Sequence, residues 1–234
     1  MMKLHRRRLR IPALAALAVA AAVVAAAAQA GSRHPVSGRV IAHVMGYEGA
    51  AWLERPERER EEAPSKAIAA LDIRPGQVVA DVGAGSGYYT TRLAEKVGPT
   101  GKVFATDLQP QMIALLNARV AKERLTQVEV VQATETDPRL PAGQLDLILM
   151  VDVYHELARP QEMLRQLRSA LKPDGRLVLI EFRKEDAGVP IREDHKMSVR
   201  EARLELEAEH YRFDRVIDVL PWQHILVFRR AVLQ

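Results

Sequence analysis

Apolar residues in this chain form short continuous runs that alternate with longer segments of helical periodicity. Runs rich in valine, leucine and isoleucine are typical of strands that are buried on both faces of a sheet. Between these runs, apolar residues recur three or four positions apart, which predicts helices with one buried face. The predicted strands are 78–82, 102–106, 128–132, 145–151 and 176–182, and the predicted helices are 66–71, 87–97, 110–124 and 160–171.

The order of these elements predicts the fold class. Strands that alternate with helices form parallel sheets whose two faces are covered by the helices. The last part of the chain departs from this alternation, because a helix at 197–209 is followed by strands at 213–219 and 223–229. Only a short Leu-Pro-Trp turn separates these two strands, so they must pair antiparallel. We therefore expect an α/β fold with a Rossmann-like, doubly wound, mostly parallel seven-stranded sheet that ends in a C-terminal antiparallel hairpin.

A glycine-rich turn follows the first predicted strand. Gly83, Gly85 and Gly87 stand at alternate positions, and a helix follows them directly. A turn of this kind lets a ligand lie against bare backbone, with amide N–H groups and the positive end of the helix facing it. The spacing is G-x-G-x-G, whereas the dinucleotide fingerprint is G-x-G-x-x-G. An NAD-dependent oxidoreductase is therefore the less favoured interpretation of this turn.

Two acidic residues strengthen the ligand-binding interpretation. Asp81 stands at the end of the first strand, and Asp107 ends the next apolar strand, 20 residues after Gly87. A carboxylate at that edge can accept hydrogen bonds from both hydroxyls of a ribose. In order, spacing and chemistry, residues 78–107 resemble motif I and the following acidic strand end of the class I S-adenosylmethionine-dependent methyltransferases. The resemblance implies their fold over about residues 64–231 and S-adenosyl-L-methionine as the cofactor.

The resemblance also assigns individual residues to the cofactor. It implies that Asp81 orients the glycine loop and contacts the methionine part, and that Asp107 binds the ribose. Leu108 and Met112 are expected to flank the adenine, with Glu135 near the adenine edge. The complete expected set is Asp81, Gly83, Ala84, Gly85, Gly87, Asp107, Leu108, Met112, Thr134, Glu135 and Val151.

A polar run, Asp152-Val153-Tyr154-His155-Glu156, follows the fourth predicted strand. Ligands of open α/β sheets bind beyond the carboxyl ends of the strands, so this run is expected beside the cofactor. Methyl transfer is a direct displacement, for which a protein mainly supplies alignment and exclusion of water. When the acceptor carries a proton, His155 is the candidate base, with Asp152 and Tyr154 as further candidate catalytic residues. In the alternative, structural interpretation, His155 hydrogen-bonds to a neighbouring carbonyl.

Residues 31–63, here called the prelude, form a linker and a helical segment before the expected domain. The charged run after Trp52 predicts a solvated helix with mixed-sign pairs that ends at Pro64. In similar methyltransferases an N-terminal segment lies over the mouth of the active site. The alternative is therefore that Trp52, Arg55 and Arg58 contact a substrate.

The loop at the end of the fifth predicted strand, residues 181–198, is long and charged, and it lies at the same edge of the expected sheet. It either holds binding residues or is simply solvated. The runs Tyr154-His155-Glu156, His195-Lys196-Met197-Ser198 and Trp52-Leu53-Glu54-Arg55-Pro56 resemble a bacterial group of predicted exported methyltransferases. The chain contains no cysteine, and no His, Asp or Glu set has the spacing of a metal site. We therefore expect no metal.

The first 30 residues resemble a targeting segment. Five Lys and Arg residues precede an apolar run at 11–28, and residues 1–30 contain no acidic residue. Ala28-Gln29-Ala30 fits a signal-peptidase site, and cleavage there would leave Gly31 as the mature N-terminus. The alternative is an uncleaved membrane anchor. Both interpretations place the following domain in the periplasm or outside the cell. Arg6-Arg7-Arg8 also partly matches a twin-arginine signal, which would export the protein already folded.

Charge argues against a nucleic-acid partner. Once the five basic residues of the leader are set aside, 29 basic and 30 acidic residues remain, a net charge of −1. The domain at 64–234 also shows no added recognition module. We therefore expect methyl transfer to a small-molecule or lipid-like acceptor, with the membrane involved only through an uncleaved leader. The non-enzymatic alternative is an exported module that binds the cofactor without turnover.

Overall fold

The computed structural model describes residues 32–231. The expected leader and its cleavage point lie outside this range, as do the last three residues of the expected domain. Within residues 32–231, no helix is both long enough and apolar enough to cross a bilayer.

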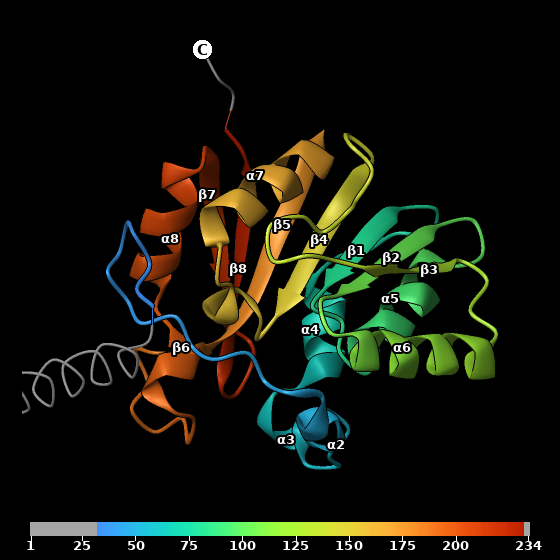
Figure 1. Ribbon diagram of the computed structural model, residues 1–234, viewed down its shortest axis with the longest axis horizontal. Coiled ribbons are helices and arrows are strands. Elements are labelled where there is room, and N and C mark those ends of the chain that lie inside the picture. Colours follow the sequence, from blue (N-terminus) through green and yellow to red (C-terminus); the bar gives the residue numbers. More distant parts are fainter. Residues whose placement is uncertain (1–31, 232–234) are drawn as a thin grey trace, which may run out of the picture. The chain divides into compact units, whose positions relative to one another are not determined.

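An eight-stranded sheet forms the centre of the domain (Figure 1). Its order is β3-β2-β1-β4-β5-β8-β7, and β6 pairs with one end of β5. The first five strands are parallel, and β8 is antiparallel to both of its neighbours, so the expected fold class is confirmed. Strand order reverses between β1 and β4, which is where open α/β sheets bind ligands. The strands are β1 (Val78–Val82), β2 (Lys102–Asp107), β3 (Val128–Gln132), β4 (Leu145–Val151), β5 (Leu171–Arg183), β6 (Lys196–Met197), β7 (Tyr211–Ile217) and β8 (Gln223–Arg230).

Helices cover both faces of this sheet. Neighbouring side chains on a strand point to opposite faces, so Val79 packs in one core and Ala80 in the other. The core around Val79 contains Leu93, and the core around Ala80 contains Leu164 and Leu206. On the first face lie α4 (Pro64–Ala70), α5 (Tyr88–Val97) and α6 (Pro110–Glu123), and on the second lie α7 (Pro160–Ala170) and α8 (Val199–Ala208).

Two features of the sheet differ from the sequence prediction. β5 begins at Leu171, directly after α7, although the Pro-Asp-Gly run suggested a turn before 176. The extra residues are accommodated by a register shift between Leu145 and Leu147, and Gly175 permits it because a Cβ there would lie 2.6 Å from the Leu145 carbonyl oxygen. β6 was not expected; it pairs in parallel with Phe182 and Arg183 and returns the chain after β5 to the sheet.

The charged run of the prelude is not a solvated helix. Arg58 and Glu62 are 3% and 0% exposed, and Arg58 Nε donates to Glu62 Oε2 at 2.7 Å. The Arg58 guanidinium also lies 4.4 Å from the ring centroid of Tyr88. Pro64 starts α4 rather than ending a helix, since its missing N–H is harmless in a first turn. The prelude folds into η1 (Tyr47–Gly49), α2 (Ala50–Leu53) and α3 (Arg58–Glu61).

The prelude runs along the edge at which the parallel strands end (Figure 1). Ala42 N and Arg39 Nη1 both donate to the carbonyl oxygen of His155, at 3.1 and 3.0 Å. Further along, Gln109 Nε2 donates to the Met45 carbonyl oxygen at 2.9 Å. These contacts hold the prelude against the loops that follow β4 and β2.

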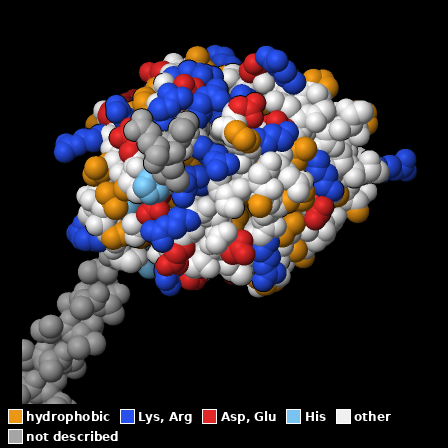
Figure 2. Space-filling model, turned by 90° about the horizontal axis from the view of Figure 1, so that it is seen from above, with side chains coloured by type: hydrophobic (Ala, Val, Ile, Leu, Met, Phe, Trp, Pro, Cys, Tyr) orange, Lys and Arg blue, Asp and Glu red, His pale blue; other side chains and the backbone are white. Residues whose placement is uncertain are grey.

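At the opposite end of the domain, where the parallel strands begin, the surface carries interspersed basic and acidic side chains with scattered apolar ones (Figure 2). This mixture agrees with the near-zero net charge of the chain outside the leader. The ligand-binding features therefore belong to the edge at which the strands end.

Candidate active site

A cavity of about 440 Å³ lies beyond the carboxyl ends of the strands near the switch point. Its wall is built from the glycine turn after β1, the loop after β2, the polar run after β4, the prelude, and the loop before β6. Apolar side chains form much of this wall, with polar groups concentrated at Asp107 and around His155. This combination is typical of small-molecule sites.

The glycine turn brings bare backbone to the cavity. Gly83 and Gly85 line it with φ angles of 74° and 55°, a region that residues with side chains rarely adopt. A Cβ at Gly83 would lie 2.5 Å from Val153, and one at Gly85 would lie 2.8 Å from Leu53. Val153 and Leu53 therefore pack directly against these two glycines, and the turn presents backbone rather than side chains to the cavity.

Asp81 lies behind this turn rather than in the cavity wall. Its carboxylate is 3% exposed and accepts a hydrogen bond from Thr90 Oγ1 on α5 at 2.6 Å. Burial raises the pKa of Asp81 to about 6. The contact ties the end of β1 to α5, and the expected contact of Asp81 with the methionine part of the cofactor stays a prediction. The position of Thr90 on the buried face of the helix is the feature of the sequence from which this hydrogen bond could have been predicted.

Asp107 connects the glycine turn to the loop after β2. Its Oδ2 accepts from Gly85 N and its Oδ1 from Gln109 N, both at 2.9 Å. The carboxyl lies in the cavity wall together with Leu108, Gln109 and Met112. Burial raises its pKa, and the two backbone hydrogen bonds oppose that shift. The two motifs that the sequence separates by some twenty residues therefore meet at one point.

Other expected cofactor residues are placed differently. Val151 lines the cavity, whereas Ala84, Gly87, Thr134 and Glu135 do not. The Thr134 hydroxyl accepts from Asp137 N within its own turn at 3.0 Å, and Glu135 is exposed. The assignment of these two residues to the adenine edge stays a prediction.

His155 lies at the other end of the cavity and is 1% exposed. Its Nδ1 faces Glu181 Oε2 of β5 at 2.5 Å, and Glu181 is completely buried. Burial lowers the pKa of His155, but the charge of Glu181 and the hydrogen bond to it outweigh burial, so the pKa is raised overall. With Nδ1 engaged by the carboxylate, Nε2 is the ring atom left facing the cavity side.

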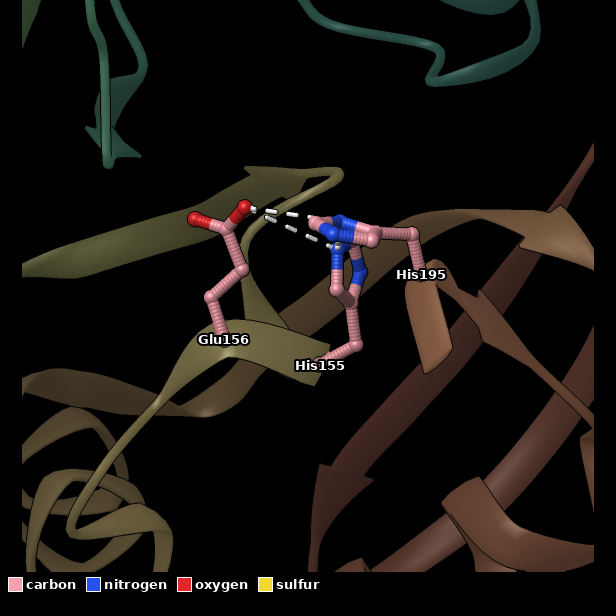
Figure 3. Close-up of side chains that lie close together, drawn as sticks. All are labelled: His155, Glu156 and His195. Carbon is pink, nitrogen blue, oxygen red and sulfur yellow. Dashed lines mark hydrogen bonds and ion pairs between the residues drawn. The ribbon is translucent and has the colours of Figure 1, made fainter. Parts of the chain in front are cut away.

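Two more titratable side chains surround that nitrogen (Figure 3). His195 Nδ1 lies 3.1 Å from His155 Nε2 and 3.7 Å from Glu156 Oε1. Glu156 follows His155 in the turn η2 (Tyr154–Glu156), and His195 ends the turn η3 (Glu193–His195). Burial raises the pKa of Glu156 to about 7, while burial and the neighbouring His155 lower the pKa of His195.

The remaining candidate catalytic residues differ in their access to the cavity. Asp152 lines it, has a φ of 54°, and accepts from Gln223 Nε2 at 2.7 Å. Burial raises its pKa well above the ordinary value. Tyr154 does not line the cavity and is fully buried. The Arg39 guanidinium carbon lies 5.3 Å from the centroid of its ring. The backbone N–H of Tyr154, not its hydroxyl, contacts the site by donating to Glu181 Oε1.

Several cavity residues were not in the expected set. Trp52 and Arg58 of the prelude line the cavity, as in the alternative interpretation, whereas Arg55 does not. Glu181 lies in the fifth strand and His195 in a run that carries the resemblance to exported methyltransferases, but no local pattern indicates that either side chain meets His155. The expectation of no metal is not tested by the fold, but the fold does join His155, Glu156 and His195.

Comparisons with known proteins agree with this arrangement. Residues 80–177 match the family model of a methyltransferase domain. Curated relatives include the ubiquinone/menaquinone biosynthesis C-methyltransferase UbiE of Ectopseudomonas mendocina, 31% identical over 48% of this chain and 44% of that protein. The same enzyme of Cupriavidus metallidurans is 31% identical over 50% of this chain and 48% of its own. The chain thus spans about half the length of the curated relatives it matches.

Solved structures extend the comparison to most of the domain. A putative type 11 methyltransferase from Sulfolobus solfataricus shares the fold, with a TM-score of 0.60 and 22% identity over 74% of this chain and 95% of that one. A SAM dependent methyltransferase from Aquifex aeolicus gives a TM-score of 0.75 and 30% identity, covering 80% of this chain and 100% of its own. Since that protein is matched over its whole length, and since the glycine turn and Asp107 meet at the cavity, the chain belongs to the S-adenosylmethionine-dependent methyltransferases.

Proposed function

We propose that this chain transfers a methyl group from S-adenosylmethionine to an apolar small molecule that enters the cavity beside His155. One observation carries the proposal: a continuous cavity joins the glycine turn and Asp107 to His155, Glu156 and His195. A methyl donor and an acceptor must lie side by side for direct displacement. The cavity provides both ends of that arrangement.

At the glycine end, the residues of this chain bind and align the cofactor. When bound, S-adenosylmethionine supplies a methyl group on a positively charged sulfonium. Gly83 and Gly85 line the cavity and present backbone without a side chain to a ligand there. The Asp107 carboxylate is positioned to accept from ribose hydroxyls, and Leu108 and Met112 offer an apolar surface for a base.

At the other end, the wall suits an apolar acceptor. Leu157 and Ile191 line the cavity, and Trp52 stands in its wall with 40% of its surface exposed. Burying an apolar molecule against such side chains is favourable by roughly 25 cal/mol per Å². The UbiE relatives are named as C-methyltransferases of ubiquinone and menaquinone biosynthesis, which supports an acceptor with a ring and an apolar tail but methylation at carbon, whereas attack by oxygen is proposed here.

His155 is the proposed contact to the reacting atom of the acceptor. Glu181 Oε2 lies 2.5 Å from Nδ1, and this contact fixes the ring. Nε2, which also lies 3.1 Å from His195 Nδ1, is then the ring nitrogen that would take the proton of an acceptor hydroxyl. Asp152 lies in the same wall, and its partner Gln223 holds it in place.

Methyl transfer from tritium-labelled S-adenosylmethionine tests this function. The full chain is incubated with phenols and hydroquinones that carry alkyl tails of increasing length. We expect label in an apolar product, and we expect His155→Ala to lower turnover by about 10²- to 10⁴-fold without loss of cofactor affinity. The exposed His210, replaced by Asn, serves as the control. A chain that binds the cofactor but methylates none of the acceptors would instead be a non-catalytic binding module.

We also propose that the domain works outside the cytoplasm. The support is the basic and apolar pattern of residues 1–30 with a small-residue cleavage site. Fractionation of expressing bacteria should find the protein in the periplasm or the membrane, and deletion of residues 2–30 should retain it in the cytoplasm. Equal distribution of the two forms would contradict this proposal.

A further inference from the structure

Three ligand-type atoms converge at the acceptor end of the cavity: His155 Nε2, His195 Nδ1 and Glu156 Oε1 (Figure 3). The two nitrogens are 3.1 Å apart, and the Glu156 oxygen lies 3.8 Å from the first and 3.7 Å from the second. They come from two 3₁₀ turns that are far apart in sequence. The parallel pairing of β6 with β5 brings the second turn to the first.

The size of this triangle matches a metal site. A point equidistant from the three atoms lies about 2.1 Å from each of them, and zinc binds imidazole nitrogen and carboxylate oxygen at about 2.0–2.2 Å. The ring centroids of the two histidines are 5.1 Å apart. Nitrogens 3.1 Å apart that each lie about 2.1 Å from one ion subtend an angle of about 95° at it, narrower than the tetrahedral angle, so binding would move the two rings slightly apart.

The surroundings also prepare these groups for an ion. A metal-binding histidine usually donates its other ring N–H to a carboxylate, which fixes the ring and makes the ligating nitrogen more basic. Glu181 Oε2, which is completely buried, occupies that place against His155 Nδ1. Met45 N donates to Glu156 Oε1 at 3.3 Å and so holds the third ligand toward the cluster.

Hydrogen bonds between the three side chains do not account for the position of Glu156. A proton between the two imidazoles accounts for the 3.1 Å contact, but Glu156 Oε1 stays beyond hydrogen-bond distance of both rings. A cation at the centre would contact all three atoms at once. All three residues line the cavity, so an ion held by them would keep a position open for a further ligand.

We propose that His155, Glu156 and His195 bind one divalent transition-metal ion, with zinc as the ion that suits two imidazoles and one carboxylate. The role of the ion rests on the proposed function. An acceptor hydroxyl bound at the open position loses its proton to water more readily, because the ion stabilises the resulting oxygen anion. That oxygen then attacks the methyl carbon as the bond from this carbon to the sulfonium sulfur breaks, and S-adenosylhomocysteine leaves. His155 serves as a ligand rather than as a free base.

Metal titration of the full chain tests the site directly. The protein is stripped with dipicolinate, and Zn²⁺ is titrated in competition with a chromophoric chelator in the absence of cofactor. We expect one ion per chain with a Kd below about 1 µM. Co²⁺ should give the visible absorption of a four- or five-coordinate site with nitrogen ligands, and Zn²⁺ should displace it.

Matched variants show whether the ion binds at this cluster. His195→Ala should weaken zinc binding at least 100-fold, and Glu181→Gln by about 10- to 100-fold. His210→Asn changes an exposed histidine far along the sequence and should have no effect. The His195 side chain is 23% exposed, so its removal is compatible with folding, which thermal unfolding verifies.

Two results would overturn the site: zinc binding weaker than about 10 µM, or equal affinities for His195→Ala and His210→Asn. The proposed function fails separately. Asp107→Ala should lose cofactor affinity and keep its zinc, because Asp107 is not among the three ligands. Zinc binding by a chain that binds no S-adenosylmethionine would therefore sustain the metal site and refute the methyltransferase activity.

Discussion

Replacing Asp81 by asparagine is expected to stabilise the fold at pH 8. The Asp81 carboxylate is 3% exposed, and Thr90 Oγ1 donates to it at 2.6 Å. Burial raises its pKa from the ordinary 3.8 to about 6, and the charge of Asp107 adds to the shift. The Thr90 hydrogen bond and the nearby Arg58 oppose it. The ionised form is therefore disfavoured in the folded protein.

The pH dependence follows from the direction of this shift. The folded protein keeps the Asp81 proton over a range in which the unfolded chain has already lost it. The free energy of unfolding therefore falls as the pH rises from about 4 to about 6, and the loss is complete above this range. The difference between 3.8 and about 6 corresponds to roughly 3 kcal/mol. Asparagine carries no charge and can still accept from Thr90, so Asp81→Asn avoids this loss.

Urea unfolding at pH 4 and pH 8 measures the effect. Asp81→Asn should be more stable than the unmodified chain by about 3 kcal/mol at pH 8, with most of the gain absent at pH 4. Asp72→Asn is the matched control, since Asp72 is 75% exposed and its φ of 46° is one that asparagine tolerates. It should change stability by less than about 0.5 kcal/mol at both pH values. A gain of the same size at both pH values, or a loss at pH 8, would refute the reasoning.

Three further changes probe other parts of the structure. Gly83→Ala places a Cβ 2.5 Å from Val153 at a φ of 74°, so unfolding should be easier by about 1–3 kcal/mol and calorimetry should show weaker cofactor binding. Glu205→Gln leaves the buried Arg39, whose Nε lies 2.8 Å from Glu205, without its counter-charge; urea unfolding should show a loss of about 3–5 kcal/mol, and a loss below 1 kcal/mol would contradict this. Trp52→Ala removes part of the apolar wall, so KM for an alkylated acceptor should rise while cofactor affinity stays unchanged.

Much of the fold could be predicted because its signals are local. The predicted bounds of β3 and β4 match the structure, since each strand is a short segment in which Val, Leu, Ile or Met predominates. β5 was predicted too short because its first residues pair through the irregular register opposite Leu145, which apolar periodicity does not reveal. The prelude was misread for a related reason. Mixed charges usually indicate a solvated helix, whereas Arg58 is buried by pairing with Glu62 and by stacking on Tyr88.

One part of the candidate site could also be predicted from local signals, and the other could not. Asp81, the glycine turn and Asp107 lie within one strand–turn–helix–strand unit, so their meeting could be predicted from spacing. The acceptor end depends on contacts between distant segments. His195 reaches His155 only because β6 pairs with β5, and Glu181 reaches the same histidine because β5 lies beside β4. Two-residue strands and buried carboxylates leave no periodic signal in a sequence.

Calorimetric titration of the full chain with S-adenosylhomocysteine, beside the Asp107→Ala variant and with NAD as the control, tests the central claim most directly. We predict micromolar binding by the unmodified chain, no binding of NAD, and an affinity roughly 30- to 700-fold lower for Asp107→Ala, since hydrogen bonds to a charged group are lost. Equal affinity of the two proteins, or binding of NAD alone, would contradict the assignment of the glycine turn and Asp107 to the methyl donor.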